Sequence, residues 1–317
     1  MTANGKNISR RQFAVLGAAT AAICATGGSL SAANESSVKR IRLGGTVFGN
    51  YDSPQSWVEA HGKWGYRAAW CPVDSDADAD EVAAYREAAA RNDLLIAEVG
   101  AWSNPLSSDS TERAAAIDLC RRQLDLADRI GALCCVNISG SRGGIWDGPH
   151  PENLTDQTFE MIVEVTRQII DEVKPSRTYF TLETMPWTYP DSPESYLRLI
   201  EAIDRERFAA HLDPVNLVCS PQRYFSNAAL IRECFAKLGR YIKSCHAKDI
   251  ILRDTLTTHL DECEPGTGGL DYATYLRELS ALPDVPLMME HMKQPEEYER
   301  AGKYIREVGN GLNISFN

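Results

Sequence analysis

Short apolar runs alternate with longer stretches of helical periodicity along most of the chain. In residues 156–173 the apolar positions recur every three to four residues, which is typical of an amphipathic helix, and similar patterns cover 79–92 and 112–130. Eight short apolar runs are predicted to be strands: 41–47, 66–71, 94–99, 133–138, 179–183, 208–213, 241–246 and 285–290.

The regular alternation of strand and helix predicts an α/β fold, in which eight parallel strands close into a (β/α)8 TIM barrel. The competing architecture is an open, doubly wound sheet. Its phosphate-binding turn is missing, because Gly44 and Gly45 after the first strand do not belong to a GxGxxG pattern. Since no linker rich in Pro, Gly or Ser divides the chain, we expect one barrel over 41–317, preceded by a linker over 34–40.

Residues 1–33 have a different character. Arg10 and Arg11 precede a mildly apolar run over 13–24 and small residues up to Ala33, a pattern typical of a twin-arginine export signal. The run is shorter than the roughly 20 residues that span a bilayer. We therefore expect an exported protein, periplasmic or extracellular, with no stable membrane insertion after processing. The alternatives are a disordered tail and a lipid anchor at Cys24.

Charge and cysteine content narrow the class of partners. The formal net charge is −11, and residues 1–33 carry only positive charges, so the processed chain is more acidic still. An acidic chain without a basic run is not expected to bind nucleic acid or an anionic membrane. The cysteines after Cys24 are scattered and form no CxxC pair, so we expect mostly buried free thiols.

The last four predicted strands each end in a residue able to bind a metal: Glu183, Asp213, His246 and Glu290. Neighbouring strands lie about 4.8 Å apart, and the C-terminal strand ends of a barrel form one face, so these side chains can converge. Three carboxylates would repel one another without a cation. With one imidazole they suit a single divalent ion, Mn²⁺, Mg²⁺ or Co²⁺, with Zn²⁺ as a further option. Four unrelated ion-paired residues are the alternative.

Five segments sharpen this interpretation: 182–187 (LETMPW), 211–216 (HLDPVN), 245–249 (CHAKD), 265–272 (PGTGGLDY) and 288–291 (MMEH). In this order they resemble the xylose isomerase-like barrel superfamily, particularly its sugar phosphate isomerase/epimerase group, over roughly 41–309. The resemblance implies that the four strand-end residues bind the metal. It also implies that Glu183 and Glu290 are catalytic, removing and returning a proton beside a carbonyl.

Further residues are candidates for substrate binding: Glu98, Trp102, Asn137, Trp187, Asn216 and Lys248. Glu98 and Asn137 are expected at the ends of the third and fourth strands, facing the mouth of the barrel. Trp102 and Trp187 follow the third and fifth strands, where they could pack against a sugar ring or simply within the fold.

Two of these candidates carry open questions. Asn216 stands where related epimerases often have a histidine, and an amide can bind a hydroxyl but cannot shuttle a proton. Lys248 could donate to a substrate oxygen or pair with Asp249. In addition, His259 could cover the pocket from the long loop after the seventh strand, whereas His291 is expected to point away from Glu290.

The sequence thus predicts a metal-dependent sugar isomerase or epimerase working through an enediolate. We expect a non-phosphorylated small carbohydrate, because export argues against phosphorylated substrates and because glycines 266, 268 and 269 fit a turning loop better than a phosphate loop. The alternatives are a lyase or hydratase of 3-keto-sugars or 3-keto-glycosides, and a non-catalytic periplasmic sugar-binding barrel. An apurinic endonuclease is disfavoured, since the histidines do not stand where its trinuclear zinc cluster needs them. A homo-oligomer stays open.

Overall fold

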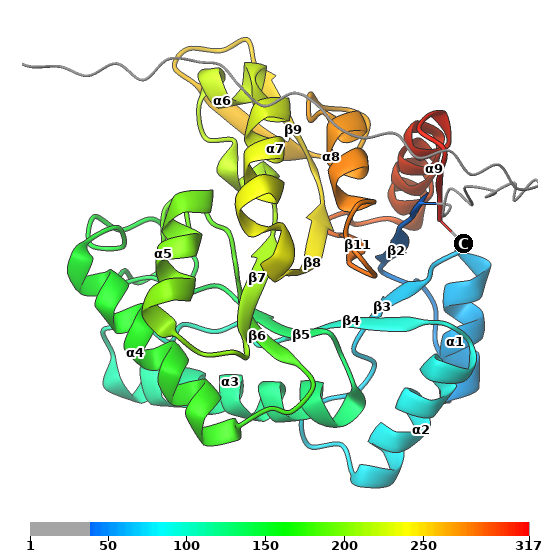
Figure 1. Cartoon of the computed structure of the whole chain (residues 1–317), viewed down its shortest axis with the longest axis horizontal. Coiled ribbons are helices and arrows are strands. Elements are labelled where there is room, and N and C mark those ends of the chain that lie inside the picture. Colours follow the sequence, from blue (N-terminus) through cyan, green and yellow to red (C-terminus); the bar gives the residue numbers. More distant parts are fainter. Residues whose placement is uncertain (1–38, 317) are drawn as a thin grey trace, which may run out of the picture. The chain divides into compact units, whose positions relative to one another are not determined.

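Eight parallel strands close into a barrel in the computed structural model, which describes residues 39–316 (Figure 1). The predicted export signal and most of the linker therefore lie outside the described residues. Neighbours around the barrel follow the order β11 (Pro286–Met289), β2 (Arg42–Gly45), β3 (Ala68–Trp70), β4 (Leu95–Gly100), β5 (Cys134–Asn137), β6 (Tyr179–Glu183), β7 (Phe208–Leu212) and β8 (Ile242–Ala247). The predicted (β/α)8 barrel is confirmed.

Helices follow the barrel strands and cover their outer side (Figure 1). They are α1 (Pro54–Lys63), α2 (Ala79–Arg91), α3 (Ser110–Ile130), α4 (Asp156–Val173), α5 (Pro193–Ile203), α6 (Pro221–Phe225), α7 (Asn227–Leu238), α8 (Tyr272–Leu279) and α9 (Pro295–Gly311), with 3-10 turns at Val215–Leu217 and Gly239–Tyr241. Three of them begin with a serine cap followed by proline: Ser53 caps α1, Ser192 caps α5 and Ser220 caps α6. The three predicted helices agree with α2, α3 and α4 to within two residues.

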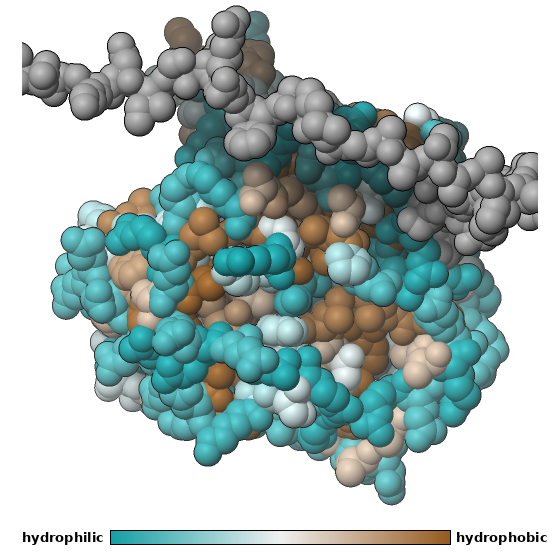
Figure 2. Space-filling model, viewed as in Figure 1, coloured by the Kyte–Doolittle hydropathy of each residue, from teal (hydrophilic) through white to brown (hydrophobic). Residues whose placement is uncertain are grey.

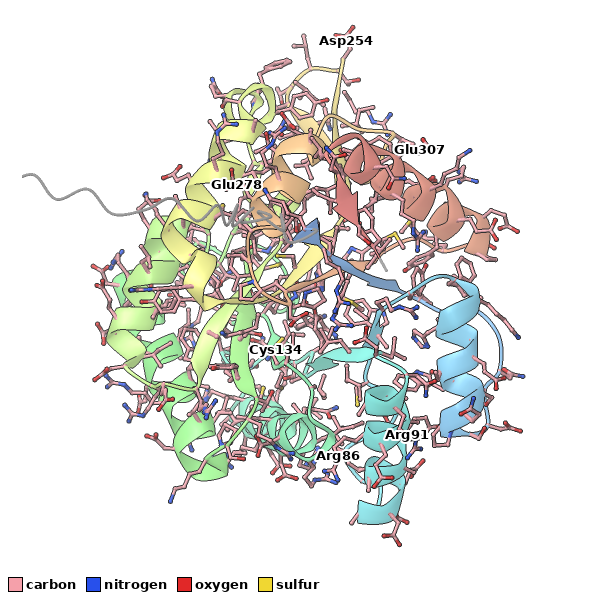
Figure 3. All side chains as sticks on the ribbon, turned by 45° about the vertical axis from the view of Figure 1, so that its right-hand side comes forward. Arg86, Arg91, Cys134, Asp254, Glu278 and Glu307 are labelled. Carbon is pink, nitrogen blue, oxygen red and sulfur yellow. The ribbon has the colours of Figure 1, made fainter. Side chains whose placement is uncertain are left out.

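The longer helices bury an apolar stripe in the core. On α4, for instance, Phe159, Ile162 and Ile169 are buried, at the helical spacing that the sequence shows. Figure 2 shows hydrophilic residues gathered on the outer helices and hydrophobic residues toward the middle of the view. The described cysteines are free and most are buried, as predicted; Cys134 lies among the central strands (Figure 3).

Two small sheets were not expected from the sequence. After β8 the chain forms an antiparallel hairpin, β9 (Asp249–Arg253) with β10 (His259–Cys263), whose outer end carries Asp254 (Figure 3). At the two ends of the described chain, β1 (Lys39–Arg40) pairs in parallel with β12 (Ile314–Ser315). Within residues 39–316, no helix combines the length and the apolar character that a membrane crossing needs.

Candidate metal centre

Four side chains from neighbouring strands converge at the C-terminal end of the barrel. Glu183 ends β6, Asp213 follows β7, His246 lies near the end of β8, and Glu290 follows β11. One ligand atom from each residue can be chosen so that all four atoms lie within 4.8 Å of one another. The structure thus brings together the four residues that the sequence predicts as metal ligands.

The imidazole of His246 stands at the centre of this cluster. Its Nδ1 lies 2.8 Å from Glu290 Oε1, 3.2 Å from Glu183 Oε1 and 3.9 Å from Asp213 Oδ2. Asp213 Oδ2 and Glu290 Oε1 are buried, yet neither makes a well-aligned hydrogen bond. Burying such oxygens is costly unless a cation or donor satisfies them. This donor set of hard oxygens and one imidazole nitrogen therefore fits a divalent metal ion.

The ammonium group of Lys248 lies beside the same carboxylates. Its Nζ is 2.6 Å from Asp213 Oδ2, 2.9 Å from Glu290 Oε1 and 3.3 Å from Glu262 Oε2. The side chain is only 2 % exposed. Lys248 consequently pairs with the acidic cluster, and the alternative pairing with Asp249 is wrong, because the Asp249 carboxylate is taken up by backbone N–H groups.

The pKa values of the cluster residues are set by burial and by the charges of their neighbours. Burial raises the pKa of Asp213 to about 6, in spite of the nearby charge of Lys248. Burial acts in the same direction on Glu183 and Glu290, but there His246 and Lys248 outweigh it and lower both pKa values. For His246, burial alone would lower the pKa, whereas the surrounding carboxylates raise it well above its usual value. Because a metal-bound imidazole must be neutral, metal binding is expected to release a proton from His246.

Glu98 lies beneath the cluster rather than in the cavity, so the expectation that it faces the mouth is wrong. Strand β4 continues to Gly100, which places Glu98 two residues below the strand end. Its Oε2 is 3.4 Å from His246 Nε2, and its Oε1 is 3.0 Å from His211 Nε2 and also accepts from Ser244 Oγ. Burial would raise the pKa of Glu98, but the two histidines lower it to about 2. Glu98 therefore holds the far nitrogen of His246 and leaves Nδ1 directed at the cluster.

Asn137 also lies away from the mouth, contrary to the sequence-based expectation. Its Oδ1 accepts from the backbone N–H of Ser103 at 3.2 Å, and its Nδ2 is 3.3 Å from Cys120 Sγ on α3. Successive side chains of a strand point to opposite sides, and Asn137 is on the side that faces the helices. It supports the packing of α3 against β5.

A cavity of about 520 Å³ adjoins the acidic cluster. Its lining is formed by Trp70, Trp102, Ile138, Trp146, Asp147, Glu183, Met185, Pro186, Trp187, Asn216, Lys248, Glu262, Glu290 and His291. Four of the residues predicted to bind substrate are among them: Trp102, Trp187, Asn216 and Lys248. The amide Nδ2 of Asn216 donates to Glu183 Oε1 at 3.0 Å and to the carbonyl of Thr184 at 3.1 Å, so Asn216 fixes one cluster carboxylate.

Several lining residues escaped the sequence analysis. His291 was expected to point away, but its φ of +63° breaks the strand alternation and turns it to the cavity, where its Nδ1 is 2.9 Å from Glu262 Oε1. Glu262 comes from the unexpected strand β10, whereas the exposed His259 of that strand is not a lining residue. Trp70 could have been found, because it ends the second barrel strand; Trp146 lies in an irregular loop that gives no such signal.

The glycine-rich segment after β10 wraps around an internal carboxylate. Gly266 and Gly268 donate their backbone N–H groups to Asp249 Oδ2 at 2.9 and 3.0 Å. A Cβ on Gly268 would lie 2.4 Å from Asp249 Oδ1, and Gly266 has a φ of +95°. These N–H groups are occupied by Asp249, which supports the interpretation as a turning loop over that of a phosphate loop.

A buried tyrosine fixes the two strands that present Glu183 and Asp213. The hydroxyl of Tyr196, on α5, lies within hydrogen-bond distance of the carbonyls of Leu182 and Ala209, which share its one proton, and it accepts from the backbone N–H of His211. Just beyond the strands, Thr184 Oγ1 exchanges hydrogen bonds of 2.8 and 3.1 Å with the backbone of Asp213. The relative positions of the two carboxylates are thereby set by the backbone.

Comparison with known proteins identifies the same kind of barrel. A family model described as xylose isomerase-like TIM barrel matches residues 58–308. No curated protein sequence matches the chain. Among solved structures, D-psicose 3-epimerase with D-tagatose from Clostridium cellulolyticum is similar at 12 % identity and a TM-score of 0.63, over 86 % of this chain and 100 % of that one.

Two further solved structures illustrate the range of proteins on this fold. A xylose isomerase-like TIM barrel protein from Mycobacterium smegmatis in complex with magnesium is 17 % identical, with a TM-score of 0.61 over 86 % of this chain and 97 % of that one. Endonuclease IV from Thermus thermophilus is 13 % identical, with a TM-score of 0.64 over 85 % of this chain and 99 % of that one. At these identities the likeness concerns the fold, and the chemistry has to be argued from the site.

Proposed function

The chain belongs to the xylose isomerase-like TIM barrel family, and from this premise we propose that it is a metal-dependent sugar isomerase or epimerase. The reaction would remove a proton beside the carbonyl of a non-phosphorylated sugar or keto-sugar and return it. The observation that carries the proposal is the convergence of three carboxylates and one imidazole beside a cavity of sugar-binding size.

The four converging residues would hold one divalent ion, with Mn²⁺, Mg²⁺ or Co²⁺ suiting the donors best and Zn²⁺ as a further option. When bound, such an ion serves as a Lewis acid and a template for adjacent oxygens of a hydroxy-ketone. The support within this chain is the donor set itself: Asp213 Oδ2 and Glu290 Oε1 are buried, make no hydrogen bond, and are balanced by ion pairs with Lys248 and His246.

Glu183 and Glu290 are the proposed proton carriers. Both line the cavity, and both have a lowered pKa, because His246 and Lys248 outweigh their burial; they are therefore carboxylate bases at neutral pH. Asn216 orients Glu183 through its hydrogen bond to Oε1. Lys248 lies at the same wall of the cavity, and its ammonium is proposed to turn to a substrate oxygen once a metal ion engages Asp213 and Glu290.

The charges of the cavity favour a neutral substrate. Among the described lining residues, Lys248 is the only lysine or arginine, and its ammonium is already shared between Asp213, Glu290 and Glu262. A phosphate group would bring about two negative charges into this acidic surrounding, where like charges repel. We therefore propose a sugar or keto-sugar without phosphate.

A lyase or hydratase acting on 3-keto-sugars or 3-keto-glycosides is the second candidate. Asn216 favours it, because related epimerases often have a histidine at this position and an amide cannot shuttle a proton. Both reactions begin with proton removal beside a carbonyl and differ in what leaves afterwards. Incubation with 3-keto-glucosides separates them: release of the aglycone supports the lyase, and epimerised ketose without release supports the epimerase.

Solvent deuterium exchange tests the shared step directly. Protein loaded with Mn²⁺ is incubated in D₂O with a panel of ketoses and 3-keto-glucosides, and deuterium incorporation is followed by NMR. We expect exchange at a carbon beside the carbonyl in at least one sugar, and its loss in Glu183→Gln. Tight sugar and metal binding without exchange in any member of the panel would instead indicate the non-catalytic binding barrel.

We also propose that the protein is exported through the twin-arginine route. The proposal rests on Arg10, Arg11 and the apolar run that follows them in the sequence. Cell fractionation of a strain expressing the full chain is expected to place it outside the cytoplasm, and Arg10→Lys combined with Arg11→Lys is expected to retain it inside. Equal distribution of the two forms would contradict the proposal.

A further inference from the structure

The residues that line the cavity fall into two groups of opposite character, called here the polar half and the apolar half. One half is polar and acidic and is formed by Glu183, Asn216, Lys248, Glu262, Glu290 and His291. The other half is mainly apolar and is formed by Trp70, Trp102, Ile138, Trp146, Met185, Pro186 and Trp187, with Asp147 as its charged residue. The proposed proton chemistry involves only the polar half, so the concentration of four tryptophans in the other half calls for a role of its own.

The tryptophans extend from the acidic cluster to the open side of the cavity. Trp70 lies innermost, with its ring centre 5.8 Å from that of His246 and nearly edge-on to it. Trp102 and Trp187 lie outermost, since 43 % and 38 % of their surfaces are exposed. Large indole surfaces are seldom left open to water without a function, and a rigid aromatic wall beside a polar site favours a flat apolar ligand.

The outer part of this wall is held in place by the loops themselves. The indole Nε1 of Trp187, after β6, donates to the carbonyl of Asp147 at 2.7 Å, which ties it to the loop between β5 and α4. That loop also contributes Trp146 to the cavity. This hydrogen bond therefore ties together two loops that each contribute an indole ring to the cavity before any ligand arrives.

We propose that the apolar half is a subsite for an aromatic group attached to the sugar, so that the preferred substrate is an aryl glycoside in its keto form. This inference rests on the proposed function, which places the sugar ring against the polar half. The cavity volume of about 520 Å³ falls within the range of roughly 300–1,000 Å³ that drug-sized ligands occupy, which leaves space beyond one sugar ring.

A second sugar ring suits this half less well than an aromatic ring. Each hydroxyl of a sugar must keep a hydrogen-bond partner when it leaves water. Among the described residues of the apolar half, the polar groups are the indole N–H groups and the Asp147 carboxylate, and the N–H of Trp187 is already used by the Asp147 carbonyl. These few groups cannot pair with all the hydroxyls of a second sugar ring. An aryl group needs no such partners and gains from ring stacking.

The test compares the binding of three unoxidised probes to Mn²⁺-loaded protein by calorimetry: methyl β-glucoside, phenyl β-glucoside and cellobiose. They lack the ketone, so they bind without being turned over. We expect phenyl glucoside to bind about tenfold more tightly than either of the others. Trp102→Ala and Trp187→Ala should each bring the ratio of phenyl to methyl affinity close to one. Trp64→Ala, which changes a tryptophan in a separate cavity between α1 and α9, should leave the ratio unchanged.

Each other outcome counts against the subsite. A phenyl-to-methyl ratio near one, with methyl glucoside still bound, would overturn the aromatic subsite and leave the proposed function standing. Cellobiose binding as tightly as phenyl glucoside would replace the aromatic group by a second sugar ring. Failure of all three probes to bind, in protein that contains metal and is folded by circular dichroism, would overturn the sugar site itself and the subsite with it.

Discussion

The two halves of the cavity are built in different ways. The polar half adjoins the acidic cluster, whose Glu183, Asp213, His246 and Glu290 each lie within one residue of a strand end. Hydrogen bonds with Tyr196, Thr184 and Glu98 fix their surroundings. In the apolar half, most of the tryptophans lie on loops after β4, β5 and β6. Strands hold catalytic side chains in fixed positions, whereas loop residues can be substituted without moving those side chains. We therefore expect substitutions in the polar half to abolish the reaction and substitutions in the apolar half to alter substrate choice.

The largest effect is expected from Asp213→Ala. It removes one of four converging donors, so both metal content and deuterium exchange should fall, the latter by about a thousandfold or more. Elemental analysis and exchange by NMR measure the two quantities. Asp147→Asn is the matched control, because this carboxylate also lines the cavity but lies outside the cluster, and it should keep both. Exchange surviving in a metal-free Asp213→Ala protein would refute the role of the cluster.

An intermediate effect is expected from Glu98→Gln. Glu98 does not line the cavity but holds His246 Nε2 at 3.4 Å, so its charge orients and strengthens the imidazole donor. Loss of such a partner typically weakens metal binding by about 10- to 100-fold. Calorimetric titration with Mn²⁺ measures this without reference to activity. An unchanged dissociation constant would show that Glu98 serves only to fill the barrel interior.

A small effect on the reaction is expected from Trp146→Ala, in the apolar half. The metal content should equal that of the parent protein, and exchange into a small sugar without an aromatic group should fall by less than about tenfold. Steady-state exchange rates at several sugar concentrations provide the measurement. A loss comparable to that of Asp213→Ala would remove the distinction between the two halves.

The smallest effect lies outside the cavity and concerns His61 on α1. Burial lowers the pKa of His61, although a hydrogen bond to the carbonyl of Trp57 at 2.8 Å opposes the shift. Because the folded pKa lies below the unfolded value near 6.5, this contribution to stability is complete above that value and is lost as the pH falls. We expect the urea midpoint to drop between pH 7.5 and 5.5, and to drop less in His61→Gln. The exposed His259→Gln is the control; the same pH dependence in both variants would exclude His61 as the cause.

The fold and the core of the site were accessible from the sequence because both depend on strands. Apolar runs of five to seven residues between helical patterns identify barrel strands, and a polar residue interrupts the apolar character at the end of four of them: Glu183, Asp213, His246 and Glu290. Burying a single polar group there is costly, so its presence signals a site. Asn137 shows the limit: a shift of one residue along a strand reverses the side to which it points.

The remainder of the site depends on irregular backbone, which periodicity does not describe. The sequence of β10, His259–Cys263, is mostly exposed and carries no apolar alternation, so Glu262 could not be placed at the cavity. His291 has a positive φ, and Trp146 lies in a loop, so the direction of neither side chain can be predicted from the spacing of apolar residues. Glu98 was predicted at the end of its strand, but β4 extends two residues further, to Gly100, so Glu98 lies deeper in the barrel.

The stoichiometry of bound metal tests the central claim most directly. Purified protein is freed of metal by a chelator, reconstituted with Mn²⁺, dialysed and examined by elemental analysis. The four converging residues predict one ion per chain, together with proton release on binding as His246 becomes neutral. Three ions per chain would indicate a cluster of the endonuclease kind, and no bound ion in folded protein would contradict the account.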